Sequence, residues 1–145
     1  MDDVAFQTLA GTEGAGYPFW SPDSRSLAFF AGDTLKKIVV SGGPPQLLCT
    51  ALRPRGGTWN RAGIIVFSAI VDNVERLQEV TDGGGVPRVL TPLDIPNISL
   101  QRFPHFLPDG RHFLFFASAR QTETDGVYVG AIGETGARRM VAGFT

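Results

Sequence analysis

The stretch YPFWSPDSR at residues 17–25 returns at residues 103–111 as FPHFLPDGR, and this repetition decides the fold. Both copies place an aromatic residue before a proline, a second aromatic at Trp20 or Phe106, and then the dipeptide Pro-Asp. A weaker copy, GTWNRAG at residues 57–63, aligns Trp59 with these two aromatics. Self-similarity of this kind indicates a repeat architecture, so the strands around the three copies come next.

Each copy is followed by apolar, β-rich runs. The run directly after each copy covers 26–31, 64–69 and 112–118 in the three repeats. The next run covers 35–40, 77–81 and 127–132. The last run of each repeat covers 46–49, 88–91 and 138–142. Glycine and proline separate the runs, which is typical of short strands joined by tight turns. Four short strands in each repeat, at a period of roughly 40 to 50 residues, are the signature of propeller blades.

The sequence therefore predicts an all-β chain, a β-propeller segment of three four-stranded antiparallel blades over 16–50, 56–91 and 101–143. The segment 6–11 has the pattern of 46–49 and is predicted to be the outer strand of a blade that is otherwise missing.

The repeated turns are predicted to be structural. Proline presets φ for the first central turn position, and the aspartate side chain can accept bonds from backbone N–H groups further along the chain. Asp23 and Asp109 are carboxylates that a catalytic pair could use, but their equivalent places in different blades favour a role in the turns. The residues assigned to turns and to packing between blades are Trp20, Pro22, Asp23, Trp59, Phe106, Pro108 and Asp109.

Composition limits the partners and cofactors that we expect. The net charge of −1 and a charged fraction of 19% give no basic field for nucleic acid. No apolar run reaches the ~18 residues of a membrane span, and the acidic start MDDVAFQTLAG differs from a signal peptide. One cysteine, Cys49, and two histidines, His105 and His112, do not supply a metal site, so we expect no metal and no cofactor.

The motifs SPDS and LPDG, each followed by an aromatic-rich strand, resemble the WD40-like (PD40) repeats of TolB-type β-propellers and of the gating propellers of prolyl-oligopeptidase-like serine peptidases. Longer strings at 11–32, 35–49, 55–68 and 102–117 are similar to the C-terminal propeller region of bacterial serine/threonine protein kinases. The resemblance covers 11–132 and departs at 71–79 and after 133. It implies a propeller for sensing or docking, on the extracytoplasmic (periplasmic) side of a bacterial membrane.

Motifs for catalysis are not found in the sequence. It has no kinase glycine-rich loop, HRD or DFG motif and no GxSxG nucleophile elbow, and GTEGAG at 11–16 fits a loop between strands. We therefore expect a non-catalytic chain whose full-length parent could be a serine/threonine kinase. The alternatives are the gating propeller of a prolyl-oligopeptidase-like peptidase and a TolB-like periplasmic docking protein.

Loop lengths point to one face of the predicted propeller. The distance from the marker aromatic to the third strand grows from blade to blade, whereas the turns at the opposite end stay short. Loops on a rigid scaffold are where binding residues concentrate. The candidate residues for binding a protein or peptide are Arg53, Arg55, Asp72, Asn97, Gln101, Arg102, Gln121, Glu123 and Asp125.

The ends of the predicted arc need a partner as well. Closed propellers have at least four blades, so a fan of three leaves the faces of its terminal blades bare. Bare apolar faces favour association. The expected partners are the remaining blades of a parent chain or another copy of this one.

Overall fold

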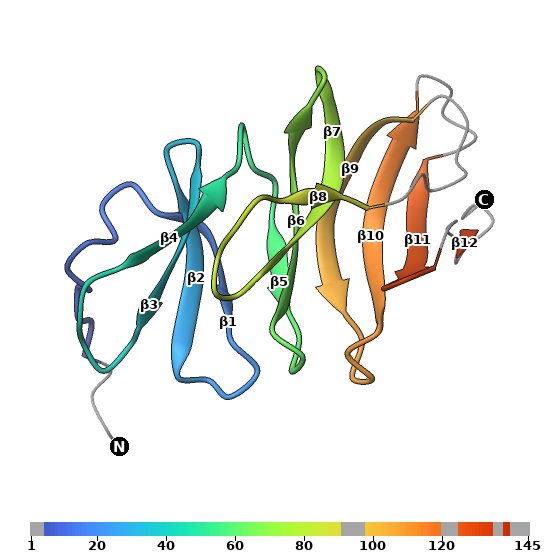
Figure 1. The fold of residues 1–145 in the computed structure, drawn as a ribbon. Helices are drawn as coiled ribbons and strands as arrows, with labels where there is room; N and C mark the ends of the chain where they lie inside the picture. The colour runs from blue at the N-terminus through green and yellow to red at the C-terminus, as the bar shows by residue number, and fades with distance from the viewer. Residues whose placement is uncertain (1–4, 91–97, 120–124, 135–137, 140–145) are drawn as a thin grey trace.

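The computed structural model describes residues 5–90, 98–119, 125–134 and 138–139. These residues form strands, turns and loops and no helix, so the described part contains no helix that could span a membrane. The strands fall into three antiparallel meanders that stand side by side (Figure 1). The chain is all-β, as predicted, and we call each meander a blade.

Each blade has four strands. Blade one contains β1 (Gly16–Trp20), β2 (Ser26–Ala31), β3 (Thr34–Val39) and β4 (Gln46–Thr50). Blade two contains β5 (Gly57–Trp59), β6 (Ile64–Val71), β7 (Val74–Thr81) and β8 (Arg88–Val89). Blade three contains β9 (Ile98–Phe106), β10 (His112–Ala119), β11 (Gly126–Ala131) and β12 (Arg138–Arg139). Blades two and three join into one sheet through a single parallel pair, Glu75 of β7 opposite Leu100 of β9.

The core consists of two layers, one in each gap between blades. Strand β6 explains this arrangement, because its residues are buried on both faces and its side chains alternate between the two layers. The layer between blades one and two includes Ala28, Phe30, Leu35, Leu48, Cys49, Ile65, Phe67 and Val80, with Phe19 and Trp59 against it. The layer between blades two and three includes Val66, Leu77, Phe106, Phe113, Phe115, Ala117 and Tyr128.

The two gaps differ in their polar contacts. Between blades two and three, Gln101 accepts bonds from the Ser68 hydroxyl (2.5 Å) and the Leu77 N–H (3.0 Å). The Phe106 N–H donates to the Thr58 hydroxyl at 3.1 Å. Between blades one and two, the Gly85 N–H donates to the Leu48 carbonyl (3.1 Å), and the Gln46 amide reaches the Gly83 carbonyl at 3.4 Å. Hydrogen bonds therefore support the gap between blades two and three more than the gap between blades one and two.

The turn between the first two strands has the same geometry in all three blades. The fourth turn residue donates its N–H to the carbonyl of the first and has a positive φ, which is 60° at Ser24. The three bonds are Ser24 to Ser21 (3.0 Å), Gly63 to Asn60 (3.1 Å) and Gly110 to Leu107 (2.9 Å). The carboxylates of Asp23 and Asp109 accept the N–H groups of Arg25 (3.0 Å) and Arg111 (2.9 Å).

The segment before β1 differs from the sequence prediction. No strand is formed over 6–11, because the third strand with which an outer strand would pair belongs to a blade that the chain does not contain. Instead the segment approaches blade one at Gly11, where an added Cβ would come within 2.7 Å of the Pro45 side chain. Figure 1 shows it, in dark blue, beside β3 and β4.

The outer face of blade one, the face turned away from blade two, also contains buried residues. Ala28 and Phe30 point into the core layer, so Phe29 between them points outward, and Ile38 shares that face. Phe29 is nevertheless 0% exposed and Ile38 only 3%. Apolar side chains are thus buried on a face on which a preceding blade would pack.

Candidate functional site

The inner strands of the three blades share the same unusual kink. Three residues before each marker aromatic, φ is positive: 49° at Tyr17, 94° at Gly56 and 56° at Phe103. A positive φ is easy for glycine but costly for a bulky side chain, and the prolines at 18 and 104 restrict the preceding residues further. Strain of this kind costs about 1–3 kcal/mol at each site and clusters at functional sites.

The kinks bring two aromatic rings together across blade two. The Tyr17 and Phe103 ring centroids are 6.5 Å apart at an interplanar angle of 40°, although the residues belong to blades one and three. Gly56 lies beneath Phe103, where an added Cβ would be 3.3 Å from the Phe103 Cα. The Phe103 N–H donates to the Arg55 carbonyl at 3.0 Å, which helps to hold the kink.

We call Tyr17 and Phe103 the aromatic pair. Their side chains are 43% and 52% exposed, so neither belongs to the core. They border a hollow of about 260 Å³ lined by Tyr17, Pro18, Gly56, Gly57, Phe103, Pro104 and His105.

An ion pair adjoins the aromatic pair. Arg102 of β9 donates from Nη2 to Oε1 of Glu75 on β7 at 2.7 Å, and from Nε to Oε2. The hydrogen bonds from Arg102 to Glu75 raise the pKa of Arg102, and the Tyr17 phenol acts in the same direction. The residue after Arg102 is Phe103, so this bidentate contact fixes β9 where its strand kinks.

The residues predicted to form an interaction face occupy different environments. Gln101 is only 8% exposed and bonds β6 and β7, so its assignment to an exposed face is wrong. The reason is that β9 begins at Ile98 and Gln101 lies inside the strand, not in the loop before it. Asn97, Gln121 and Glu123 lie outside the described residues.

Arg102 also lies inside β9, where it pairs with Glu75, so its assignment to a loop is wrong as well. The other predicted residues, Arg53, Arg55, Asp72 and Asp125, lie in loops or turns. Arg53 (φ 45°) donates its N–H to Asp33 at 3.3 Å, and Arg55 donates from Nη1 to the carbonyl of the preceding proline at 2.8 Å. Asp72 is exposed at the turn between β6 and β7, and Asp125 accepts a bond from Ser118 at 2.9 Å. Whether these residues bind a partner stays a prediction.

Backbone bonds place several of these loops at one edge of the blades. The Ala51 N–H donates to the Asp33 carbonyl in the turn between β2 and β3, at 2.8 Å. The Ile70 N–H, near the end of β6, donates to the Leu52 carbonyl at 2.8 Å. The connection 51–56 then leads directly to Gly56 under the aromatic pair, so the loops and the pair share this edge.

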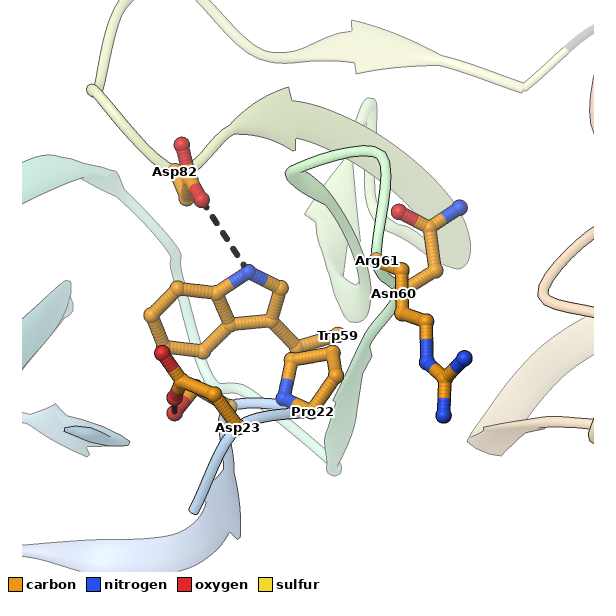
Figure 2. A pocket seen from close by; sticks show the side chains of 7 residues that line it. Pro22, Asp23, Trp59, Asn60, Arg61 and Asp82 are labelled. Carbon is orange, nitrogen blue, oxygen red and sulfur yellow. Dashed lines mark hydrogen bonds between the residues drawn. The ribbon is translucent and has the colours of Figure 1, made fainter. Parts of the chain in front are cut away.

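The opposite edge carries the short turns and two larger hollows. In one of them, of about 410 Å³, the Trp59 indole N–H donates to Asp82 at 3.2 Å, and Pro22 and Asp23 lie beside the ring (Figure 2). The Ser21 hydroxyl, followed by the Arg25 N–H, lowers the pKa of Asp23, so this carboxylate is held within its own turn. A neighbouring hollow of about 680 Å³ extends from Trp20 to Asp109 along the inner strand ends.

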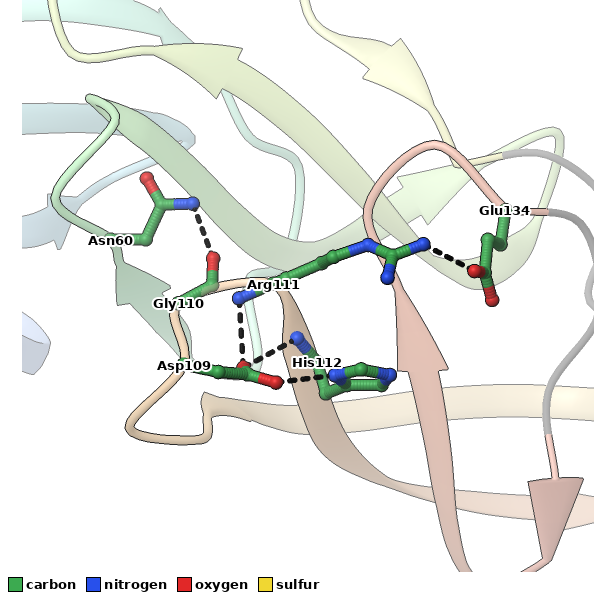
Figure 3. Close-up of polar contacts among 6 residues, drawn as sticks. All are labelled: Asn60, Asp109, Gly110, Arg111, His112 and Glu134. Atoms are coloured by element: carbon green, nitrogen blue, oxygen red, sulfur yellow. Dashed lines mark hydrogen bonds and ion pairs between the residues drawn. The ribbon is translucent and has the colours of Figure 1, made fainter.

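Asn60 ties the turns of blades two and three together, and Asp109 braces the second of these turns. Asn60 donates to the Gly110 carbonyl at 2.8 Å, and Asp109 contacts the His112 ring at 2.5 Å (Figure 3). The N–H groups of His112 and Arg111, followed by the His112 ring, lower the pKa of Asp109 to about 2. The contacts of Asp109 thus lie within its own turn. The described residues contain no cluster of three or more potential metal ligands.

Comparisons with known proteins bear on the fold. No protein-family model and no curated protein matches the chain. Among solved structures, a protein described as a TolB from Agrobacterium tumefaciens is 20% identical with a TM-score of 0.69, over 86% of this chain and 45% of that one. TolB from Acinetobacter baumannii is 13% identical with a TM-score of 0.70, over 98% and 35%.

A structure from a study of two prolyl endopeptidases is 17% identical with a TM-score of 0.66, over 90% of this chain and 22% of that one. The chain thus spans less than half the length of each of these proteins. Their similarity, together with the three meanders, identifies the fold as part of a β-propeller, as the repeat predicted.

Proposed function

We propose that the chain is a non-catalytic propeller module that binds a protein or peptide partner at the aromatic pair. The observation that carries this proposal is that two strained residues are not buried. Tyr17 and Phe103 adopt a positive φ that is unfavourable for bulky side chains, yet about half of each residue remains exposed. A core residue would repay such strain by packing. Exposed aromatic side chains are also favoured anchors at protein interfaces.

The size of the hollow supports a particular kind of partner. At about 260 Å³ it lies just below the ~300 Å³ at which sites for whole small molecules begin. Its walls are the two rings, Pro18 and Pro104, so an apolar side chain projecting from an extended segment would fit it best. The surrounding loops with Arg53 and Asp72 would then contact the rest of that segment.

For the full-length protein, we propose the propeller half of a bacterial serine/threonine kinase, on the extracytoplasmic side of the membrane. The support is the similarity of the strings at 11–32, 35–49, 55–68 and 102–117 to such regions. The fold shared with TolB and with a prolyl endopeptidase keeps a TolB-like docking protein and a peptidase propeller as the alternatives. Reading the coding sequence on both sides of this segment distinguishes a kinase domain, an α/β-hydrolase domain and a leader peptide.

The binding proposal is tested by selecting peptides from a random library on the immobilised chain. A double variant, Tyr17→Gly with Phe103→Gly, serves as the counter-target because glycine accepts the positive φ and removes only the rings. We expect enriched peptides that carry apolar anchors and bind the wild-type chain alone. Peptides that bind both proteins equally would show that the aromatic pair is not the site.

The non-catalytic assignment is tested separately with purified chain. We expect no ATP hydrolysis and no phosphorylation of a generic substrate above a mock preparation. Turnover that follows the protein through two chromatographic steps would overturn it.

A further inference from the structure

The hollow of about 410 Å³ beside Trp59, which we call the indole hollow, lies between the short turns of blades one and two. It is on the edge opposite the aromatic pair, so it is a separate place on the molecule. Its volume falls within the ~300–1,000 Å³ of sites for small molecules. Residues of this chain build both of its sides, since Pro22 and Asp23 face Trp59 across it (Figure 2).

Four charged side chains surround the half-buried Trp59 ring. Asp82 accepts the indole N–H at 3.2 Å, and Asp23 lies on the other side of the ring (Figure 2). The Nζ atom of Lys37 is 6.0 Å from the centroid of the Trp59 ring. Arg61 lines the hollow as well, with its guanidinium directed away from the indole. Two carboxylates and two cations therefore leave this site without a net charge.

These groups keep hydrogen-bonding capacity for a ligand. From the described residues Asp82 accepts one hydrogen bond and Asp23 accepts two, of the roughly four that a carboxylate can take. The exposed guanidinium of Arg61 makes no hydrogen bond or ion pair to any residue that the structure describes. The indole hollow thus combines spare acceptors, spare donors and an aromatic ring.

We propose that the indole hollow binds a neutral sugar that packs against Trp59. A hydroxyl group both donates and accepts hydrogen bonds, so sugar hydroxyls suit the carboxylates of Asp23 and Asp82 and the guanidinium of Arg61 alike. The C–H groups of a sugar ring carry small positive charges that match the negative face of an indole. A charged ligand would meet a like charge for every opposite one, so the balance of charges favours a neutral ligand with many hydroxyls.

Nuclear magnetic resonance of the ¹⁵N-labelled chain is the primary test. The two tryptophans give two indole N–H signals, and the variant Trp20→Phe identifies that of Trp59. The probes are glucose, galactose, mannose and N-acetylglucosamine. For sugars of about 12 to 15 non-hydrogen atoms we expect a dissociation constant of about 1 mM. At least one sugar should shift the Trp59 signal saturably below about 50 mM, and no saturable shift with any of them would overturn the proposal.

Two arginine variants locate the sugar. Arg61→Ala is expected to raise the dissociation constant about tenfold, because a hydrogen bond from a charged donor is lost. Arg25→Ala is the matched control, since Arg25 is an equally exposed arginine of the neighbouring turn that does not line the hollow. It should bind the sugar as the wild-type chain does. Wild-type affinity in Arg61→Ala would overturn this placement of the sugar.

A cationic probe tests the class of ligand. Arginine amide would bind if the carboxylates of Asp23 and Asp82 governed the site. We expect it to bind more weakly than the sugar, and the affinity for the sugar to be the same at about 50 mM and about 500 mM sodium chloride, because no charge is neutralised. A saturable shift of the Trp59 signal at lower concentrations of arginine amide than of any sugar would overturn the proposal in favour of a cation site.

Discussion

Replacing Phe103 by glycine and by alanine measures the strain that the proposed binding site depends on. Both variants remove the same half-exposed ring, so the loss of packing cancels between them. At φ 56°, alanine keeps a left-handed backbone penalty of about 1–2 kcal/mol that glycine avoids. Glycine in turn loses about 0.5–1 kcal/mol more than alanine through unfolded-state freedom. Glycine is therefore expected to be the more stable variant by about 0.5–1 kcal/mol, the reverse of the usual order.

Urea denaturation followed by circular dichroism gives the two free energies of unfolding. Relative to wild type, Phe103→Gly is expected to lie within about 1 kcal/mol, because relief of strain offsets the loss of a half-buried ring. Phe115→Ala, at a 1% exposed core position, is the contrasting variant and should cost about 3–5 kcal/mol. An alanine variant at 103 as stable as the glycine variant, or a glycine variant as damaging as Phe115→Ala, would refute the reasoning.

Three further predictions concern the turns and the core. Asn60→Ala should lower the free energy of unfolding by about 2 kcal/mol, measured in urea, because the 6% exposed amide bonds the Gly110 carbonyl and the Ile64 N–H. In the folded chain the pKa of Asp109 is about 2, below its usual 3.8. Its ionised form therefore contributes stability above about pH 4, and this contribution is lost as the pH falls towards 2. Melting curves of Asp109→Asn, measured across this pH range, should lack this part of the acid sensitivity. Burial raises the pKa of Cys49 to about 11, so Ellman's reagent should label it at neutral pH only as fast as the protein opens, and rapid labelling of the native chain would contradict its burial.

The repeat in the sequence predicted the all-β fold because turn chemistry and apolar runs are local signals. Pro-Asp turns and buried strands recur at spacings that only a stack of similar blades explains. The aromatic pair was missed, because tyrosine and phenylalanine are not residue types that indicate a positive φ at positions 17 and 103. A signal was nevertheless present, since Gly56 occupies the repeat-equivalent position and glycine is the residue that tolerates such a φ.

Two other differences came from tertiary context. The segment 6–11 has the pattern of an outer strand, but a strand forms only where a neighbour offers backbone bonds, and the chain contains no third strand for it. Gln101 was assigned to a loop because it falls in the long connection before the third marker aromatic, whereas its side-chain and backbone oxygens accept bonds from blade two. The exposed face around Arg53 and Asp72 stays a prediction.

The unequal support of the two gaps has a mechanical consequence. Backbone pairing at Glu75, the ion pair to Arg102 and the Gln101 bonds fasten blade three to blade two, whereas apolar packing provides most of the hold on blade one. A pulling force applied to the two ends of the chain would part blade one from the rest first, and blades two and three would resist as one body. In a protein that connects two anchored structures, the first gap would act as a tension-sensitive joint.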